Sequence, residues 1–446
     1  MIPAKKNIAN WNNYPVVPAN EFSFDYSEEL PFLLEPAKSM IARGNGRCYG
    51  DASLSENVIS TLKYHHILFF DKENGIIECE SGILFKDLID FLIPGGWFLP
   101  VTPGTKFITL GGAVASDVHG KNHHKEGSFS EHILELKLMT ADQEIFTVSK
   151  HQNTDLFFAT VGGMGLSGLI LSVKFRLKKI KTAYISQKQI RTKNLDEVIE
   201  LFEEYKNFTY TMAWIDCLQQ GHKQGRSVMF AGEHTKIEEL TVSQQKRPLQ
   251  IHSRKSLSVP FNLPAFVLNQ SSVKLFNSMY YGMHRTKQNA IIDYDSFFFP
   301  LDSILHWNKM YGKSGFIQYQ FVLPISDGSE GLKKILNKIS EKGWGSFLAV
   351  LKLFGKQKSL ISFPMEGLTL ALDFPIRKGI FEFLNELDVI VIDHGGRIYL
   401  SKDARMNRET YLKTYQNAEE FQRIIKKYNP GTQFESYLSK RLGLLD

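Results

Sequence analysis

Residues 43–51 read RGNGRCYGD, and this stretch is the first of four glycine-rich loops in the N-terminal part of the chain. The other three loops are residues 103–104, 111–113 and 162–168. Glycine lets the backbone adopt positive φ and approach a ligand closely, and the free N–H groups of such turns form nests that bind anions. One such loop means little. Four of them in one region favour a site for a pyrophosphate-bearing cofactor.

Short apolar stretches separate these loops. Residues 76–80 (IIECE) and 169–177 (LILSVKFRL) alternate apolar and polar side chains with a period near two, which predicts strands. Residues 84–92 (LFKDLIDFL) carry apolar side chains at helical spacing ahead of a Pro-Gly-Gly stop, which predicts a short helix. We therefore expect a mixed α+β domain here.

Residues 163–168 (GMGLSG) formally satisfy the GxGxxG pattern of a dinucleotide-binding Rossmann unit. Such a fingerprint must open a helix and must be followed about twenty residues later by an acidic residue. Here the glycines run into the alternating stretch LILSVKFRL, and no acidic residue stands at that distance. The sequence therefore predicts no Rossmann unit at this position.

The overall composition limits the class of protein. The 446 residues are 43% hydrophobic and 22% charged, which is typical of a soluble globular protein and not of a disordered or multi-spanning one. This length exceeds what a single core usually organises, so we expect two domains. The net charge of +6 is mild and no long basic run occurs, which predicts no nucleic-acid partner but leaves room for a phosphate-bearing substrate or an anionic membrane surface.

The cysteines and the N-terminus indicate where the protein works. Cys48, Cys79 and Cys217 are far apart, so neither a disulfide framework nor a structural zinc site is indicated. The first residues, MIPAKKNIANWNNYPVV, lack the basic-then-apolar run of a signal peptide, and no stretch of about 18 apolar residues occurs. We expect a cytoplasmic protein with only peripheral membrane contact, a periplasmic location remaining open.

The composition shifts near Ile180, where we place a domain boundary. Residues 246–300, rich in Ser, Pro, Asn, Phe and Tyr, show weak periodicity and predict a long irregular excursion, which could serve as a mobile lid or be a variable surface insertion. Towards the C-terminus, Gly395-Gly396 leads into a predicted strand that ends at Lys402. A helix is predicted over residues 407–427.

Three histidines lie close together in the stretch HGKNHH, at positions 119, 123 and 124. His119 and His123 are four residues apart, as ligands on one helical face would be. Gly120 and Asn122 disfavour a helix, however, and no HExxH motif is present. We therefore predict no metal site, and we consider contact with a cofactor or substrate a better interpretation than a purely structural polar loop.

The glycine loops carry a family resemblance. RGNGRCYGD, PGTKFITLGGAVASDVHGKNHHKEGSFSEHI and FFATVGGMGLSGLI closely resemble the FAD domain of the vanillyl-alcohol-oxidase type flavoproteins. HGKNHH, GFIQYQFVLP, LKLFG, LDFPI and GGRIYLSKDAR resemble, within that superfamily, the decaprenylphosphoryl-ribose 2-oxidase family, the flavoprotein half of a bacterial cell-wall epimerase. The resemblance covers nearly the whole chain.

The resemblance implies a fold and a domain division. The fold would be the two-domain α+β architecture of the vanillyl-alcohol-oxidase/PCMH type, with an antiparallel-sheet substrate domain. Residues 1–180 would bind FAD and residues 181–394 would bind substrate, with the mobile 246–300 excursion inside the second domain. Residues 395–446 would return to the FAD domain.

The resemblance also implies site residues. FAD would be bound by Arg43, Gly44, Asn45, Gly46, Arg47, Cys48, Tyr49, Gly104, Thr105, Gly111, Gly112, Ala113, Ser116, His119, Gly120, Lys121, Asn122, Gly168, Ile170 and Tyr399. The sugar would be bound by Lys121, Gln318, Gln320, Lys352, Asp373 and Lys402. Lys402, His119 and Tyr49 would be the catalytic residues, with Lys402 as general base or as an electrostatic partner of the reduced flavin.

Two positions depart from the related patterns. Histidyl-flavin members of the superfamily carry a histidine directly after the loop glycine, whereas Gly46 is followed here by Arg47 and Cys48, so we expect FAD to be non-covalent. Mycobacterial members of the resembled family carry a cysteine two residues before the aspartate of the DFP motif. This chain has Ala371 there, which changes the shape of the sugar pocket.

The function implied by the resemblance is oxidation of the 2-hydroxyl of a polyprenyl-phosphoryl pentose to a 2-keto sugar, after which a separate NAD(P)H-dependent short-chain reductase restores the alcohol. The enzyme would be bacterial and peripheral to the inner membrane, with the basic and aromatic 246–300 excursion facing the lipid. The alternatives are an alditol or aldonolactone oxidase of the same fold acting on a soluble substrate, and a flavin-binding protein without turnover.

Overall fold

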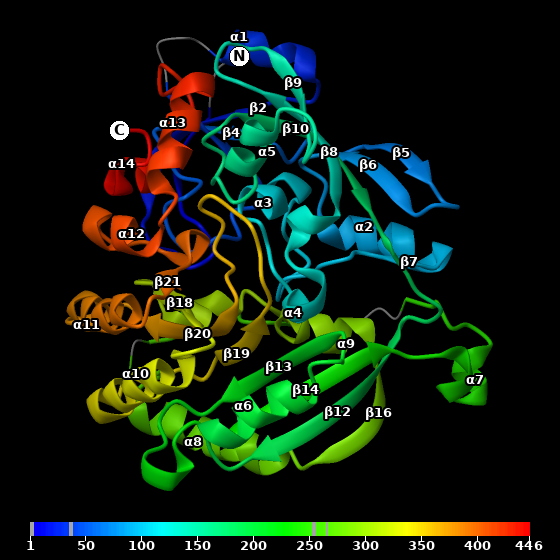
Figure 1. Ribbon diagram of the computed structural model, residues 1–446, viewed down its shortest axis with the longest axis vertical. Helices are drawn as coiled ribbons and strands as arrows, with labels where there is room; N and C mark the ends of the chain where they lie inside the picture. Colours follow the sequence, from blue (N-terminus) through cyan, green and yellow to red (C-terminus); the bar gives the residue numbers. More distant parts are fainter. Residues whose placement is uncertain (1–3, 35–38, 252–255, 265) are drawn as a thin grey trace.

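The computed structural model describes residues 4–34, 39–251, 256–264 and 266–446 (Figure 1). Helices combine with mainly antiparallel sheets, so the α+β prediction is confirmed. In Figure 1 the N-terminal sheets and the C-terminal helices α12–α14 occupy the upper part of the molecule, and a large sheet occupies the lower part. The site described below lies between them.

Two sheets organise the N-terminal part. A four-stranded sheet has the order β1 (Ala4–Ile8), β2 (Val17–Ser23), β4 (Asn57–Ser60), β3 (Ile41–Arg43), and its last two pairings are parallel. An antiparallel five-stranded sheet has the order β5 (Ile67–Asp71), β6 (Ile76–Glu80), β10 (Leu169–Arg176), β8 (Ile133–Met139), β9 (Ile145–Val148). The strand predicted at 76–80 is confirmed to the residue, and the one predicted at 169–177 ends one residue early.

Short helices connect these strands. Helix α2 (Phe85–Leu92) confirms the predicted helix, because Phe85, Leu88, Ile89 and Leu92 form one buried stripe and Gly96 ends the following turn in the left-handed region. Helices α3 (Leu110–Ala115), α4 (His123–Glu126) and α5 (Thr154–Thr160) follow. The GxGxxG stretch leads into β10 and not into a helix, so the rejection of a Rossmann unit is confirmed.

An eight-stranded antiparallel sheet forms the lower part of the molecule (Figure 1). Its order is β16 (Lys287–Asp293), β12 (Tyr184–Thr192), β14 (Ser227–His234), β13 (Tyr210–Ile215), β19 (Ala349–Phe354), β20 (Gly367–Pro375), β18 (Phe316–Pro324), β21 (Arg397–Ile398). Helices α6 (Leu195–Glu204), α10 (Gly328–Lys342) and α11 (Ile380–Asp393) pack on it. Tyr319 of β18 donates to Asp388 of α11 (2.9 Å), so α11 covers the face opposite to Gln318 and Gln320.

The predicted irregular excursion over residues 246–300 is wrong for most of its second half. Residues 270–298 fold as helix α8 (Gln270–Met283), edge strand β16 and helix α9 (Tyr294–Phe298). Helix α8 buries only Val273 and Asn277, a contact too narrow to produce a clear helical period in the sequence. Part of the excursion, at 252–255 and 265, lies outside the described residues.

The C-terminal segment also differs from its prediction. The strand expected up to Lys402 is only the two-residue β21, because the chain then turns into a 3-10 helix over Leu400–Lys402. The helix expected over 407–427 is two helices, α12 (Arg408–Thr414) and α13 (Ala418–Tyr428), separated where Tyr415 donates to the Ile398 carbonyl (2.6 Å). Helix α14 (Tyr437–Leu442) follows α13.

The C-terminal segment packs against the N-terminal sheets. Helix α13 contacts α5, and Met40 forms a parallel bridge with Phe434, with the Glu435 N–H donating to the Met40 carbonyl (2.9 Å). These contacts support the proposed return of residues 395–446 to the first domain. The division at 180 and 394 stays a prediction.

The remaining elements are short: α1 (Leu30–Leu33), β7 (Trp97–Phe98), β11 (Lys178–Lys179), α7 (Val242–Gln245), β15 (Leu257–Ser258) and β17 (Ile304–Leu305). Cys48, Cys79 and Cys217 are free thiols. Within the described ranges, no helix has both the length and the apolar character needed to cross a bilayer, and no three His, Cys, Asp or Glu side chains gather in a metal-binding arrangement.

Asn277→Ala should loosen α8 from the sheet. The Asn277 amide donates to Asp216 Oδ1 (2.9 Å) and to the Ser346 carbonyl (3.4 Å), and losing a partner of a buried carboxylate costs about 1–3 kcal/mol. We expect faster proteolysis within residues 256–300, mapped by mass spectrometry, with cleavage elsewhere unchanged. Ser271→Ala, on the exposed first turn of α8, is the control. Equal cleavage of the two variants would show that this contact does not hold the helix.

Candidate active site

A cavity opens between the glycine loops of the N-terminal part and one face of the eight-stranded sheet. Its volume is about 330 Å³, and it opens to solvent. Pockets for small ligands measure roughly 300–1,000 Å³. The cavity therefore has the size of a small-ligand site.

Most of the predicted site residues line this one cavity, although they come from segments spread over more than 350 positions. Those that do are Gly44, Asn45, Gly46, Arg47, Cys48, Tyr49, Gly104, Thr105, Gly111, Gly112, Ser116, His119, Lys121, Gly168, Ile170, Gln318, Gln320, Lys352, Asp373, Tyr399 and Lys402. Their individual roles stay predictions, but the structure brings the set together.

Four predicted cofactor residues, Arg43, Ala113, Gly120 and Asn122, do not line the cavity. The Arg43 guanidinium points away and donates to Ser53 Oγ (3.2 Å) and to the Ala9 carbonyl (2.9 Å), which braces the loop from behind. Ala113 is buried in the hydrophobic core, and the Asn122 amide donates to the Pro100 carbonyl (2.8 Å). Arg43 and Asn122 thus support the loops around the cavity, and direct cofactor contact by these four residues stays a prediction.

The loop after β3 fits a pyrophosphate. Across the described residues, the backbone N–H groups of residues 44–48 have no hydrogen-bond acceptor, while these residues face the cavity. Gly46 has φ +59°, and a Cβ there would lie 2.3 Å from the Arg43 guanidinium. A row of free N–H groups in a tight glycine turn is an anion nest, so the loop can hold the cofactor's phosphates.

The second glycine pair contributes differently. The N–H of Gly111 donates to the Ser81 carbonyl (2.7 Å), and the N–H of Gly112 donates to Thr109 Oγ1 (3.2 Å). The start of α3 is therefore already satisfied by the protein. Gly111 and Gly112 form a smooth wall of the cavity and do not offer free donors.

Three neighbouring strands supply the wall opposite the glycine loops. Gln318 of β18 stands beside Asp373 of β20, and Gln320 stands beside Ala371 in the same antiparallel register. Lys352 comes from the adjacent β19. Side chains two residues apart on a strand share a face, so this sheet presents amides, a carboxylate and an ammonium group together.

His119 is buried in an aromatic cage. Its ring lies 4.7 Å from Phe354, 5.6 Å from Phe363 and 5.3 Å from Tyr399, measured between centroids. Its Nε2 accepts a hydrogen bond from Gln320 (3.0 Å), so the ring proton lies on Nδ1, which has no hydrogen-bond partner among the described residues. Burial, reinforced by the positive charge of Lys352, holds the pKa of His119 well below its usual value. His119 is therefore a neutral donor and a poor proton acceptor.

Lys402 lies against Tyr49. Its Nζ is 3.6 Å from the Tyr49 ring centroid, a cation–π distance when the amine is charged. Burial lowers the pKa of Lys402 to about 7, although Asp373 and Cys48 oppose that shift. The carboxylate of the next residue, Asp403, pairs with Arg441 (2.7 Å). A lysine with this pKa can accept a proton near neutral pH.

Asp373 is the carboxylate whose charge has the largest effect on the pKa of Lys402. Burial raises the pKa of Asp373 to about 7, against the opposing effect of the hydrogen bond from Gln318 (2.6 Å) and the charge of Lys402. Tyr311 also reaches this carboxylate at 3.5 Å. The charges of Asp373 and Lys402 therefore each shift the pKa of the other group.

Two further lysines face the cavity. Burial lowers the pKa of Lys121 to about 7 and that of Lys352 to about 8. Lys121 donates to the Phe297 carbonyl, and its ammonium lies 4.3 Å from the Phe297 ring centroid. Among the described residues neither Lys352 nor Lys402 forms an ion pair within 4.0 Å. Three such amines at one cavity are suited to an anionic ligand.

Several lining residues were not predicted, among them Trp11, Thr61, Ser81, Met212, Asp302 and Trp307. Trp11 stacks under the Arg47 guanidinium (4.0 Å to the ring centroid), and Asp302 accepts from the Lys106 N–H (2.8 Å). The first contact joins residues 36 positions apart and the second joins residues 196 positions apart. No local periodicity or motif marks either contact.

Comparison with known proteins defines the class. The FAD binding domain family matches residues 27–149, which contain the nest at 44–48 and most of the cavity's glycines. The chain binds FAD and is an FAD-dependent oxidoreductase that acts on a CH–OH group, in the vanillyl-alcohol-oxidase type fold. The prediction of fold, cofactor and enzyme class is confirmed.

The relatives narrow this class. Decaprenylphosphoryl-beta-D-ribose oxidase of Mycolicibacterium smegmatis is 36% identical over 417 residues, which cover 92% of this chain and 90% of the relative. The chain belongs to the decaprenylphosphoryl-beta-D-ribose oxidase family. L-gulonolactone oxidase of Mus musculus is 27% identical over 184 residues, 40% of this chain, and a D-lactate dehydrogenase of Archaeoglobus fulgidus is 27% identical over 173 residues.

We predict that acid precipitation of the purified holoprotein releases all of its FAD. The residue after Gly46 is Arg47 and not histidine, and burial raises the pKa of the neighbouring Cys48 thiol, which therefore stays protonated and poorly nucleophilic. The flavin in the supernatant is measured by absorbance. Yellow fluorescence that remains with the denatured polypeptide on a gel would contradict the prediction.

Proposed function

We propose that the enzyme oxidises the 2-hydroxyl of a polyprenyl-phosphoryl pentose to the 2-keto sugar. The observation that carries this proposal is the cluster of Lys121, Lys352 and Lys402 at one cavity that also presents the sugar-binding amides Gln318 and Gln320. Amides and a carboxylate suit hydroxyl groups, and the amines suit a phosphodiester. The name of the Mycolicibacterium relative supports a decaprenylphosphoryl sugar as the substrate.

The chemistry supplied by bound FAD is acceptance of the hydride from the carbinol carbon. As that carbon becomes a ketone, the hydroxyl proton must leave, and Lys402 in its neutral form takes it at Nζ. Asp373 lowers the cost of the resulting charge because a carboxylate near an ammonium group favours the charged form.

The other residues bind and orient. Gln318 is fixed by its hydrogen bond to Asp373, and Gln320 by His119 and by Thr369 Oγ1 (3.3 Å), so both amides keep a fixed orientation toward a sugar. His119, neutral and caged, holds Gln320 and offers the Nδ1 proton as a donor. Lys121 and Lys352 bind the negative charge of the substrate.

The alditol or aldonolactone oxidase alternative is not favoured. The L-gulonolactone oxidase match spans 42% of that relative, and a soluble sugar alcohol gives the lysine cluster no anion to bind. A panel of free alditols and polyprenyl-phosphoryl sugars, mixed anaerobically with the holoenzyme, separates the two functions. Bleaching of the flavin by alditols alone would contradict our proposal.

Lys402→Met should retain FAD and reduce it at least about a hundredfold more slowly, because one acid–base group is lost. In the wild type, the rate of anaerobic flavin bleaching should rise as pH increases through about 7, since Lys402 is protonated below its pKa and able to accept a proton above it. This rise should disappear in the variant. Wild-type bleaching by Lys402→Met with the polyprenyl-phosphoryl substrate would show that Lys402 is not the base.

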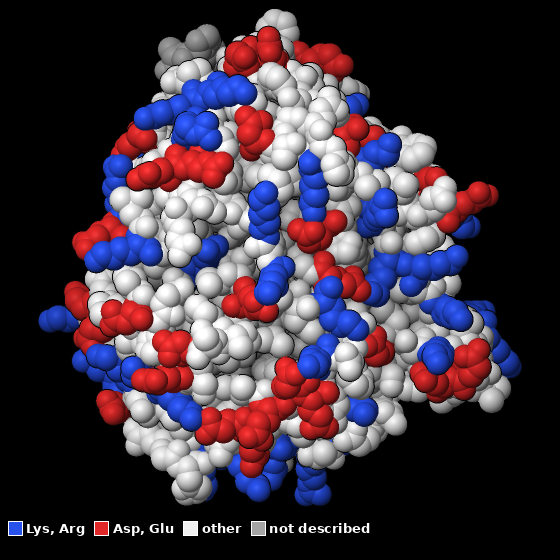
Figure 2. Space-filling view, viewed as in Figure 1, with Lys and Arg blue, Asp and Glu red and all other residues white. Residues whose placement is uncertain are grey.

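A bacterial location peripheral to the inner membrane, and a separate NAD(P)H-dependent short-chain reductase as the partner in epimerisation for cell-wall biogenesis, complete the proposed function. The product ketone needs a hydride donor for its return to an alcohol, and no second dinucleotide motif occurs in the sequence. On the face in Figure 2, basic and acidic side chains are interspersed without a single basic field, which suits the absence of a nucleic-acid partner.

One segment supports membrane contact. Between Glu239 and Asp293 the sequence contains no acidic residue but seven Lys or Arg. Its described part exposes Phe261 (63%), Phe266 (76%) and, along one face of α8, Leu275, Met279 and Met283. Apolar side chains beside basic ones suit the surface of an anionic bilayer.

Phe261→Ser/Phe266→Ser should bind vesicles more weakly. Burial of one Phe side chain contributes about 1.5–3 kcal/mol, so losing two should reduce partitioning by more than about tenfold. Co-sedimentation with vesicles that contain anionic phospholipid measures the effect. Phe32→Ser, at an 82% exposed site in α1, is the matched control. If the double variant sediments like the wild type, this segment does not bind the membrane.

A further inference from the structure

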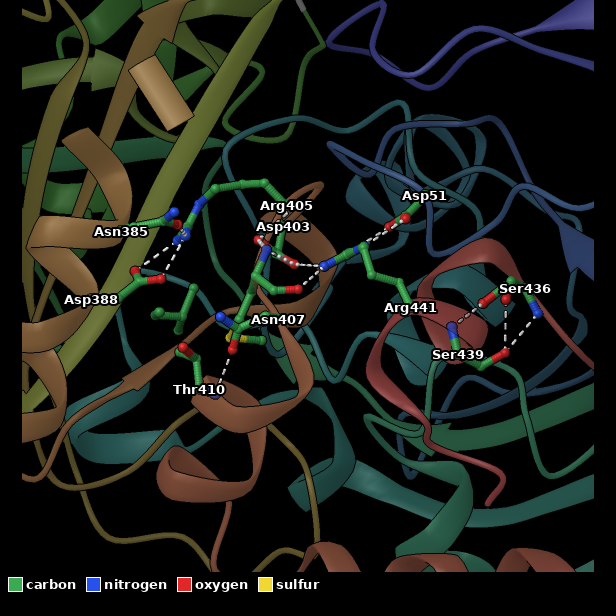
Figure 3. A network of polar contacts seen from close by, with 12 residues as sticks. Asp51, Asn385, Asp388, Asp403, Arg405, Asn407, Thr410, Ser436, Ser439 and Arg441 are labelled. Atoms are coloured by element: carbon green, nitrogen blue, oxygen red, sulfur yellow. Dashed lines mark hydrogen bonds and ion pairs between the residues drawn. The ribbon is translucent and has the colours of Figure 1, made fainter. Parts of the chain in front are cut away.

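Arg441 of helix α14 joins two carboxylates from opposite ends of the chain. Its Nε and Nη2 donate to the two oxygens of Asp51 (3.0 and 2.8 Å), and its Nη1 donates to Asp403 (2.7 Å) and to the Met406 carbonyl (Figure 3). Asp51 and Asp403 are both buried. A guanidinium that spans two carboxylates in this way fixes their separation as well as neutralising charge.

The two carboxylates lie next to the predicted catalytic pair. Asp51 is two residues after Tyr49, and Asp403 directly follows Lys402. The Tyr49 N–H donates to the Ser401 carbonyl (2.9 Å), so the two segments are also joined through their backbones. Gly50 has φ +140°, and a Cβ there would lie 2.0 Å from the Asp403 carbonyl oxygen. The contact therefore leaves no room for a side chain at position 50.

The same loop is held from its other side. Arg405 pairs with Asp388 of α11 through two hydrogen bonds (2.5 and 2.6 Å; Figure 3). Asp388 also accepts a hydrogen bond from Tyr319 of β18. Tyr319 lies between Gln318 and Gln320 on that strand. Residues 402–406 are thus clamped between the C-terminal helix and the sheet that supplies the sugar-binding wall.

We propose that Arg441 is a positioning residue that sets the place of Lys402 over Tyr49. This inference rests on the proposed function, in which Lys402 is the base. Arg441 lies outside the cavity lining and acts through Asp403 and Asp51. Without the bridge, Lys402 swings away from the buried wall toward solvent, and it loses both its orientation and the burial that makes it a neutral base.

The charges agree with this geometry. Burial by itself would raise the pKa of Asp403, but Arg441 and Arg405 outweigh it, and the pKa of Asp403 falls below its usual value. Burial raises the pKa of Asp51 despite the hydrogen bonds from Arg441. A positive charge at position 441, in addition to that of Arg405, is therefore needed to balance the Asp51 and Asp403 carboxylates. The forked guanidinium of arginine is needed to fix the spacing between these two carboxylates.

Arg441→Lys separates these two requirements, because lysine keeps the charge but its single ammonium cannot hold both carboxylates in the same geometry. We expect the holoenzyme to keep its FAD content and to bleach its flavin roughly tenfold to a hundredfold more slowly with the polyprenyl-phosphoryl substrate. The pH midpoint of that rate should rise by at least about one unit, as a less buried lysine returns toward its ordinary pKa.

A second readout does not depend on turnover. In protein labelled with [ε-¹³C]lysine, the Lys402 resonance is assigned from its absence in Lys402→Arg, and its titration midpoint is followed by NMR. Asp51→Asn, an isosteric change that weakens one arm of the bridge, should shift this midpoint in the same direction as Arg441→Lys. Arg408→Met removes a different C-terminal ion pair, with Asp446, and should leave the midpoint unchanged.

The outcomes are distinguishable. A Lys402 titration in both variants equal to that of the wild type overturns the proposal, and so does slower bleaching without any change in that titration, which indicates a merely structural role. If none of the polyprenyl-phosphoryl sugars bleaches the flavin of the wild type, the proposed function fails. The NMR titration of Lys402 then still decides whether Arg441 positions this lysine.

Discussion

The backbone contact between residues 49–51 and 401–403 is the constraint on which the site depends. It brings Tyr49, from the loop that follows the first glycine turn, against Lys402, from the segment that leaves the eight-stranded sheet. Gly50 is the residue that permits this approach, since the Asp403 carbonyl occupies the space of a Cβ. The cavity lies where two sheets are joined, with the glycine loops on one side and the side chains predicted to bind the sugar on the other.

Burial gives the cavity its chemistry. Lysines are among the most exposed side chains in proteins, yet Lys121, Lys352 and Lys402 share one cavity whose walls lower each pKa to about 7 or 8. An ordinary lysine could bind an anion but could not accept a proton at neutral pH. The same burial keeps His119 neutral and makes it a poor proton acceptor. His119, which the family resemblance places among the catalytic residues with Lys402, is therefore not suited to act as the base. The surroundings of each side chain, and not its residue type, decide whether it is suited to bind an anion or to accept a proton.

Local patterns predicted the parts of the fold whose side chains pack close to their own backbone. The alternation in residues 76–80 and the apolar stripe of residues 85–92 gave a strand and a helix because each element buries a complete face. Helix α8 was missed because it buries two residues only, and the strand toward Lys402 was overextended because β21 pairs with β18 for two residues before the chain turns. A local sequence pattern does not predict the helix or strand correctly where a single long-range contact decides the local structure.

By itself the sequence determined the glycine loops, the family resemblance and, through them, most of the residues at the cavity. These are properties of short segments, and they can be recognised from the order of residues along the chain. Only the tertiary structure decided that Arg43 supports the first glycine loop from behind, that Asp403 pairs with Arg441, and that three lysines lie at one cavity where burial lowers their pKa. Those outcomes depend on contacts between residues tens to hundreds of positions apart, and no local spacing encodes such contacts.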